Sequence, residues 1–526
     1  MPKGVIDEAE LYPKPDMTQK TVPYISHDQY PKEAVVLENL TPNFMRDTSL
    51  LPIRVEDDIL RIVMDDPDDS DTIEALQFAF NFKIEVYQGK REDIQEAIER
   101  LYGAGSQSIE TIIEEAGRDV YEISADTDTD TEHLRDMASE APIIRLVNRL
   151  ILNAVEMRAS DIHFEPFENQ FRVRYRIDGV LHEAESPPRR LQAAVISRVK
   201  IMSKLDIAER RLPQDGRIKL KIADREIDFR VSTIPTLYGE SLVMRILDRE
   251  TLVLDLHQLG FPPEMLESYT RLIAQPYGMI LVTGPTGSGK TSTLYTTLAR
   301  INSPACKIIT LEDPVEYQLK GINQIQVNPK IGLTFAGGLR SIVRQDPDII
   351  LVGEIRDRET AEIAVQSALT GHLLFSTLHT NDSAGAVTRL LDMGVENFLL
   401  SSTLLGIMAQ RLVRLNCPDC TRPVQPDPKL VRAMNLTEAE QEETVFYAGQ
   451  GCDTCRSTGF KGRTAIFEYM EVDERIRKDI VSGATSDMIR QTAVEKGMAT
   501  LRDDGWRKVR EGATTISEVL RVTLDN

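Results

Sequence analysis

The sequence lacks a hydrophobic run long enough to cross a membrane. The longest apolar stretch, 398–413, has about 16 residues and contains Gln410 and Arg411, whereas a spanning helix needs about 20 apolar residues. We therefore expect a buried helix at 398–413. The amino-terminal residues have no apolar signal-peptide core and no small-residue cleavage site, so we expect a chain without a secretion signal.

Basic residues are scarce relative to acidic ones. Lys and Arg total 62 against 83 Asp and Glu, which gives a net charge of −21. Because nucleic-acid binding relies on basic patches, this balance argues against a DNA- or RNA-binding protein.

Cysteine is also rare, with five residues in the chain. Four of them form two C-x2-C pairs, and in a large chain without a secretion signal such pairs indicate a metal site rather than disulfides. Cys306 stands alone before a predicted strand, where we expect it to be a small buried hydrophobic residue.

The length of 526 residues suggests about three or four domains at roughly 150 residues each. Residues 1–34 are polar and proline-rich, which predicts a loose arm. In residues 35–103, LPIRV and ILRIVM predict a hairpin, and apolar spacing predicts a helix at 91–102. Residues 104–140 contain the acidic run ADTDTDTEH and are predicted to be a linker.

A second α/β domain is predicted at 141–247. In FRVRYRID (171–178), apolar and charged residues alternate strictly, which indicates a half-buried strand. Asp178 and Gly179 then form a turn signal. Further strands are predicted at 227–233 and 242–247.

The segment MILVTGPTGSGKTSTLY (279–295) contains the pattern G-x-x-x-x-G-K-[ST] between an apolar strand and a helix. Glycines let backbone N–H groups close around phosphates, and the helix amino terminus adds partial positive charge. Lys290 is expected to reach the β- and γ-phosphates, and Thr291 to offer its hydroxyl to Mg²⁺. The predicted ATP-binding residues are Gly284, Pro285, Thr286, Gly287, Ser288, Gly289, Lys290 and Thr291.

Two further apolar strands end in acidic residues. KIITLEDPVEY (307–317) ends in Glu312, Asp313 and Glu316, and DIILVGEIRD (348–357) continues into Gly353 and Glu354. A carboxylate at a strand tip beside a nucleotide can orient water or hold metal, although helix capping beside Pro314 is the alternative for the first three carboxylates.

Arginines and histidines accompany these strands. Arg340 and Arg344 are spaced i, i+4 on a predicted helix. There they either stabilise the charge on a transferring phosphoryl group or form an ordinary surface pair. His372 and His379 flank the predicted strand LLFST, and such histidines have either a structural or a functional role.

Four segments resemble, in the same order along the chain, the motifs of the secretion-ATPase superfamily, which powers type II secretion and type IV pili. The Walker A loop is matched by GPTGSGKT, the Asp box by TLEDPVE, Walker B by DIILVGE and the His box by TGHLLFSTLHTND. The resemblance implies that Glu354 is the Walker B acid serving Mg²⁺, that Glu312 is the general base, and that His372 and His379 belong to the catalytic set. Which glutamate activates water stays open.

SDIHFEP (160–166), RYRIDG (174–179) and DFRVSTIPTLYGESLVMRIL (228–247) resemble the family's PAS-like second N-terminal domain. In the family, arginines of this domain close over the nucleotide, and Arg230 and Arg245 occupy the matching positions, with Arg217 a weaker match. Residues 35–103 resemble the first N-terminal domain, which docks onto an inner-membrane platform protein. Val343 stands where leucine is usual in the family.

Two longer segments resemble the type II secretion assembly ATPases, the general secretory pathway protein E family. They are PPRRLQAAVISRVKIMSKLDIAERRLPQDGRI and LRDDGWRKVREGATTISEVLRVT. The resemblance implies a cytoplasmic homo-hexamer, peripheral at the inner membrane through partners, that hydrolyses ATP to assemble a pseudopilus. A type IV pilus extension ATPase and a nucleotide-gated scaffold with little turnover remain alternatives.

The cysteine pairs are Cys417–Cys420 and Cys452–Cys455, separated by about 31 residues. Each C-x2-C pair can supply two thiolates to a tetrahedral zinc ion, and four protein ligands leave no open position, so the site is predicted to be structural. A nucleic-acid-binding zinc ribbon is the alternative, with Phe460, Lys461 and Arg463 as its support.

The predicted fold class is therefore α/β and multi-domain, with a RecA-like P-loop core. The domain boundaries that we expect after the PAS-like domain are a RecA-like ATPase domain at 248–412, a tetracysteine zinc module at 413–468 and a C-terminal helical region at 469–526. The predicted cofactors are ATP, Mg²⁺ and Zn²⁺.

Overall fold

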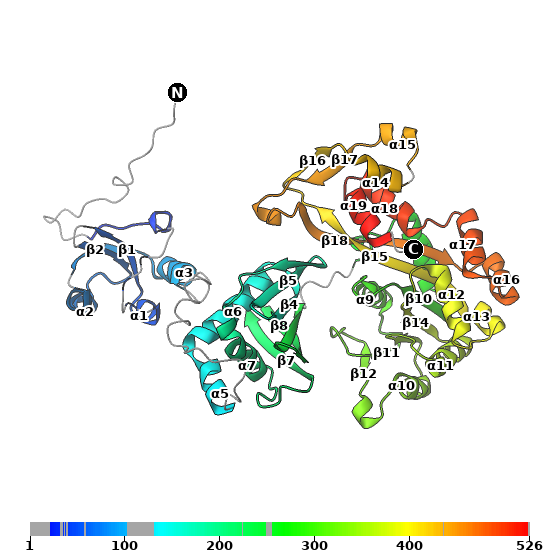
Figure 1. Ribbon diagram of the computed structural model, residues 1–526, viewed down its shortest axis with the longest axis horizontal. Coiled ribbons are helices and arrows are strands. Elements are labelled where there is room, and N and C mark those ends of the chain that lie inside the picture. The colour runs from blue at the N-terminus through cyan, green and yellow to red at the C-terminus, as the bar shows by residue number, and fades with distance from the viewer. Residues whose placement is uncertain are drawn as a thin grey trace. The chain divides into compact units, whose positions relative to one another are not determined.

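The computed structural model describes residues 22–102, apart from 32–34, 36, 38, 39, 41, 57, 58 and 81, and residues 131–523, apart from 223, 224, 249–254 and 435. The predicted arm (1–34) and linker (104–140) lie partly outside these ranges. The chain divides into two compact units, with the main change from one to the other near residue 247. Figure 1 colours the elements from blue at the N-terminus to red at the C-terminus. In the described part of the chain, no helix combines the length and the apolar character needed to span a membrane.

The first sheet has three strands in the order β1-β2-β3. The predicted hairpin is confirmed, because β1 and β2 pair antiparallel, and β3 then adds parallel to β2. The predicted helix at 91–102 is confirmed as α3, which packs on this sheet through Ile94, Ala97 and Ile98. The elements are α1 (Pro42–Asp47), β1 (Leu50–Glu56), β2 (Ile59–Met64), α2 (Ser70–Phe80), β3 (Lys83–Gln88) and α3 (Arg91–Tyr102).

Residues 22–31 belong to this first sheet domain. Tyr24 forms a parallel bridge with Gln88 of β3, and the Ile25 N–H donates to the Gln88 carbonyl at 3.0 Å. Ile25 and Tyr30 are buried in its core. The predicted loose arm is therefore wrong for residues 22–31, because this segment pairs with the edge strand β3 at Gln88 and contributes two side chains to the core.

The next part of the first unit is a six-stranded sheet in the order β6-β5-β4-β9-β8-β7. The predicted alternation of β5 is confirmed, with Phe171, Val173 and Tyr175 buried. Asp178 and Gly179 have φ of 49° and 85°, which makes the predicted tight turn into β6. The elements are α6 (Ala141–Glu156), β4 (Ala159–Pro166), β5 (Phe171–Ile177), β6 (Val180–Glu183), α7 (Gln192–Met202), β7 (Gln214–Ile222), β8 (Arg225–Thr236) and β9 (Gly239–Asp248).

Helix α5 (Thr131–Ser139) lies within the segment predicted to be a linker. It packs against α6 and α7, and Leu134, Met137 and Ala138 are buried. The linker prediction is therefore wrong for residues 131–139, whose apolar spacing (Leu134, Met137, Ala138) indicates a helix once the acidic run ends.

The second unit is built on a seven-stranded sheet in the order β12-β11-β13-β14-β10-β15-β18. All pairs between β12 and β15 are parallel, and β18 is antiparallel to β15. The strands are β10 (Gly278–Thr283), β11 (Ile308–Glu312), β12 (Asn323–Gln326), β13 (Ile349–Val352), β14 (Leu373–Leu378), β15 (Leu404–Asn416) and β18 (Phe460–Glu471).

Helices cover both faces of this sheet, which explains why its inner strands are apolar on both sides. One face packs on α8 and α9, and the other packs on α10 to α13 together with α16 and α17. The helices are α8 (Pro263–Ile273), α9 (Lys290–Ile301), α10 (Phe335–Ile342), α11 (Arg358–Leu369), α12 (Ser383–Asp392), α13 (Asn397–Thr403), α16 (Glu474–Ser482) and α17 (Ser486–Glu495).

The predicted buried helix at 398–413 is confirmed for residues 398–403 and wrong for residues 404–413. The short helix α13 ends at Thr403, and β15 begins at Leu404 and runs between β10 and β18. A buried apolar run is compatible with either helix or strand, and pairing with two neighbouring strands decided the outcome here.

The last elements extend beyond the sheet. A two-stranded sheet, β16 (Thr421–Val424) and β17 (Phe446–Gly449), lies between the cysteine pairs with α14 (Pro428–Ala433) and α15 (Glu438–Glu443). Helices α18 (Leu501–Arg510) and α19 (Ile516–Thr523) follow β18 and α17. Glu518 of α19 is buried and accepts from Arg414 of β15 at 2.6 Å, which ties the C-terminal helix to the sheet.

Candidate nucleotide site and cysteine cluster

The phosphate-binding loop connects β10 to α9 as the sequence predicted. Gly284, Gly287 and Gly289 have φ of 145°, 80° and 90°, a region that favours glycine. A Cβ on Gly284 would lie only 2.5 Å from the Gln410 carbonyl and 2.7 Å from the Ser288 hydroxyl. The loop therefore requires glycine, and its backbone leads directly into the amino terminus of α9, where anions bind favourably.

Lys290 begins α9 and is folded over the loop. Its Nζ donates to the carbonyls of Gly284 at 2.6 Å and Pro285 at 3.2 Å. Burial lowers its pKa to about 8, partly offset by the charge of Glu354. A phosphate group placed here would supply the negative charge that favours the protonated amine.

The loop also holds a polar atom without a protein partner. The Ser288 hydroxyl is buried and has no hydrogen-bond partner among the described residues, and buried polar groups normally have one. Together with Lys290 and the helix terminus, this hydroxyl fits a bound phosphate group.

The acidic side of the site includes the end of strand β11, which β13 and β14 separate from β10 in the sheet. Glu312, the last residue of β11, is 5% exposed. Its carboxylate accepts from the Tyr295 hydroxyl, the Thr310 hydroxyl and Gln324 Nε2, the last at 3.3 Å. Glu312 is therefore held in one orientation by three side-chain donors, and none of these hydrogen bonds among the described residues caps a helix.

Glu354 follows β13, and its carboxylate contacts one arginine and one histidine. Arg356 pairs with its Oε1, and His379 Nε2 lies 3.3 Å from its Oε2. Close packing favours the glycine before it, since a Cβ on Gly353 would lie 3.2 Å from the Leu311 carbonyl and 3.3 Å from Glu312 Cα, both tighter than an ordinary van der Waals contact. The Gly-Glu form of this strand end thus lets the ends of β11 and β13 lie against each other.

These groups line one pocket of about 420 Å³ at the carboxyl ends of the parallel strands. The phosphate loop, both glutamates and one predicted histidine meet there. Thr291 and Glu354, predicted to hold Mg²⁺, both line it and offer the oxygen donors that this ion prefers. The lining includes Pro285, Thr286, Gly287, Ser288, Gly289, Lys290, Thr291, Glu312, Asp313, Glu316, Gly353, Glu354, His379 and Arg463.

Other predicted residues do not line this pocket. His372 precedes β14, at the amino end of the strand, and its Nδ1 lies 2.8 Å from the Ser367 carbonyl. Arg340 pairs with Glu359 on the surface. Arg230 and Arg245 belong to β8 and β9 of the first unit, where Arg245 Nε lies 3.1 Å from Asp161.

Sequence reasoning missed three residues around the loop. Gln410 accepts from Thr293 of α9 at 2.8 Å, and buried Arg411 donates to the Asn381 carbonyl at 2.9 Å. Their polarity within an apolar run was a usable signal, which the helix prediction obscured. Tyr295, which donates to Glu312, gave no local signal because a buried helical tyrosine is ordinary in a core.

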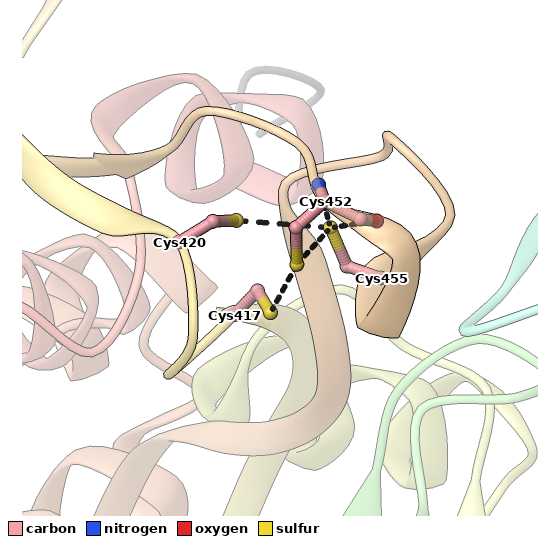
Figure 2. Close-up of side chains that lie close together, drawn as sticks. All are labelled: Cys417, Cys420, Cys452 and Cys455. Atoms are coloured by element: carbon pink, nitrogen blue, oxygen red, sulfur yellow. Dashed lines mark hydrogen bonds between the residues drawn. The ribbon is translucent and has the colours of Figure 1, made fainter. Parts of the chain in front are cut away.

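The four paired cysteines converge at the end of β15 (Figure 2). Sγ–Sγ distances are 3.8 Å for Cys417–Cys452, 3.7 Å for Cys420–Cys455 and 3.7 Å for Cys452–Cys455. Disulfide sulfurs lie about 2.05 Å apart, whereas Zn–S bonds of about 2.3 Å at tetrahedral angles place sulfurs about 3.8 Å apart. The arrangement fits a tetrahedral zinc ion.

The cluster also favours thiolate at one position. Burial opposes ionisation of Cys455, but N–H groups of Cys452 and Gly459 donate to its Sγ at 3.2 and 3.3 Å and lower its pKa to about 6. Metal ligation requires the thiolate form, so the backbone here is arranged for a ligand.

The doubly covered parallel sheet, the phosphate loop and the two strand-end glutamates define a P-loop nucleotide-binding protein. Residues 136–521 match the family described as Type II/IV secretion system protein, and residues 21–108 match the MshEN domain. The chain belongs to this family of secretion ATPases.

Comparisons with individual proteins agree with this family assignment. The chain is 51% identical over 499 residues to type II secretion system protein E of Xanthomonas campestris pv. campestris, covering 95% of this chain and 87% of the relative. It is 44% identical over 521 residues to the type IV pilus assembly ATPase PilB of Myxococcus xanthus, covering 98% and 91%. The crystal structure of the Legionella pneumophila ATPase DotB shares the fold, with a TM-score of 0.54 at 21% identity over 72% of this chain and 95% of that one.

Proposed function

We propose that this chain is a Mg²⁺-dependent ATPase that powers pseudopilus assembly in type II secretion. The observation that carries the proposal is the single pocket in which Lys290, Glu312 and Glu354 meet. The relative named type II secretion system protein E, matched along nearly its whole length, supports the choice of machine.

The residues divide the chemistry as follows. Lys290, the Ser288 hydroxyl and the loop amides would hold the phosphates, and Thr291 and Glu354 would hold the ion. Magnesium, when bound, neutralises charge on the phosphate oxygens. Glu312 accepts a proton from the water that attacks the γ-phosphate. The water oxygen forms a new bond to the γ-phosphorus as the bond between that phosphorus and the β-phosphate oxygen breaks.

We further propose a homo-hexamer, in which Arg230 and Arg245 close over the nucleotide. Residues 35–103 dock onto an inner-membrane platform protein, so that the chain acts in the cytoplasm at the membrane through partners. Zinc at Cys417, Cys420, Cys452 and Cys455 stabilises the module between β15 and β18.

The match to a pilus assembly ATPase keeps type IV pilus extension as a second candidate. Neighbouring genes separate the two: secretin, platform and pseudopilin genes indicate secretion. The chemistry proposed for the pocket is the same in both.

The experiment that tests the proposed function is ATPase activity per subunit against protein concentration with Mg²⁺. We expect activity to rise steeply, because assembly completes each site. Flat and appreciable activity would mean that each subunit is self-sufficient. Tight ATP binding without turnover at any concentration would support the scaffold alternative instead.

A further inference from the structure

The buried hydroxyl of Tyr295 lies between the phosphate loop and the acidic strand. Tyr295 is on α9, five residues after Lys290, and its side chain is fully buried. The hydroxyl donates to Glu312 Oε2 and accepts from the Glu316 N–H at 3.3 Å. One side chain therefore connects the helix that begins at the phosphate loop with both ends of the segment 312–316.

The remaining donors occupy the other oxygen of Glu312. Its Oε1 accepts from Thr310 and from Gln324. A carboxylate oxygen has about two lone-pair sites, so Oε1 is fully used, whereas Oε2 keeps one site after accepting from Tyr295. Since Glu312 lines the pocket, that remaining site is the one available to a water molecule.

We propose that Tyr295 is a positioning residue for ATP hydrolysis, which holds Glu312 so that the free lone pair of Oε2 receives the proton of the attacking water. The inference rests on the proposed function and adds a residue to it. The water oxygen bonds to the γ-phosphorus, the bond to ADP breaks, and the proton passes to Oε2 and later to solvent.

Tyr295 is suited to remain a donor throughout the cycle. Burial and the neighbouring charge of Glu312 raise its pKa above the ordinary value for tyrosine. The hydroxyl therefore keeps its proton at neutral pH and does not compete with Glu312 as a base.

The chain offers a matched control in Tyr269. It is also fully buried against α9, and its hydroxyl pairs with Thr297 at 2.8 Å. Tyr269→Phe and Tyr295→Phe each remove one buried hydroxyl from the same core, and only the second removes a contact to Glu312.

The experiment measures kcat, KM for ATP and melting temperature of the full-length wild type and both variants at assembling concentrations. We expect Tyr295→Phe to lower kcat about tenfold or more, a part of what a general base contributes, with KM and melting temperature close to those of Tyr269→Phe. Equal kcat in the two variants overturns the inference. A raised KM or a selectively lowered melting temperature in Tyr295→Phe also overturns it, in favour of a structural role.

A second pair of variants tests the orientation of Glu312 without changing Tyr295. Thr310→Ser keeps the hydroxyl donor to Oε1 and is expected to retain activity, whereas Thr310→Val is expected to lose turnover with KM unchanged. Equal activity in both contradicts the need to orient Glu312. A wild type without any ATPase activity is a different outcome, because then the proposed function fails and this inference fails with it.

Discussion

At the scale of the residue, the charge of Lys290 is set by its surroundings. Lys290 is 9% exposed, and burial lowers the pKa of its amine from 10.5 to about 8. In the pH range between these values the unfolded chain binds more protons than the folded chain, so the contribution of Lys290 to stability rises with pH there. A phosphate beside the amine acts in the opposite direction, because it favours the charged form.

We therefore predict that ATP binding at pH 8 is accompanied by uptake of about half a proton per site. Calorimetric titration in buffers of different ionisation enthalpy measures it. Lys290→Ala is the matched control, expected to show no such uptake and no turnover while keeping the wild-type melting temperature and zinc content. Equal proton uptake in this variant would contradict the assignment.

At the scale of the element, the cysteine module is an insertion carried by two paired strands. Cys417 directly follows β15, and its N–H donates to the Gly459 carbonyl at 2.9 Å, just before β18 begins. The β16–β17 ladder and helices α14 and α15 lie between the two cysteine pairs. Zinc would therefore close a long loop at its base, where a structural site contributes on the order of 10 kcal/mol to folding.

Cys417→Ser is expected to lower zinc from about one ion per chain to well below one, and to make residues 421–450 sensitive to protease. Nucleotide affinity is expected to change little, since the phosphate loop follows β10, Glu312 ends β11 and Glu354 follows β13. Cys306→Ser, which alters a cysteine outside the cluster, serves as the control. Unchanged zinc in Cys417→Ser would refute the four-cysteine site.

At the scale of the whole molecule, the proposed catalytic groups come from two units. Lys290, Glu312 and Glu354 share the pocket of the second unit, whereas Arg230 and Arg245 belong to the sheet of the first. An arginine that stabilises a transferring phosphoryl group is worth about 10³–10⁵ in rate, so a site without these arginines binds nucleotide and turns it over slowly.

Mixing two inactive variants tests whether the arginines act between subunits. Arg230→Ala and Lys290→Ala are each expected to be inactive alone. An equal mixture is expected to recover roughly a quarter of the activity, because in a randomly assembled symmetric ring about a quarter of the interfaces join a subunit with intact Lys290 to a neighbour with intact Arg230. The same experiment with Arg245→Ala in place of Arg230→Ala tests the second arginine. No recovery would place these arginines within their own subunit or outside the reaction.

The strand–loop–helix of the phosphate site and the strands ending at Glu312 and Glu354 could be predicted from the sequence. Each is a short segment whose apolar period and glycine spacing are local properties. The prediction of a helix at 398–413 failed for residues 404–413, because that run is buried and its state depends on pairing with β10 and β18. The partners of Glu312 were also beyond the sequence, because Tyr295 and Gln324 reach it from different elements.

By itself, the sequence determined the phosphate loop, the two strand-end glutamates and the four-cysteine ligand set, since motif spacing encodes all three. Only the tertiary structure decided which carboxylate is held by three donors, which histidine reaches the pocket and how the two cysteine pairs meet. Those outcomes depend on strand order and on side-chain contacts between distant segments, and no local pattern along the chain specifies them.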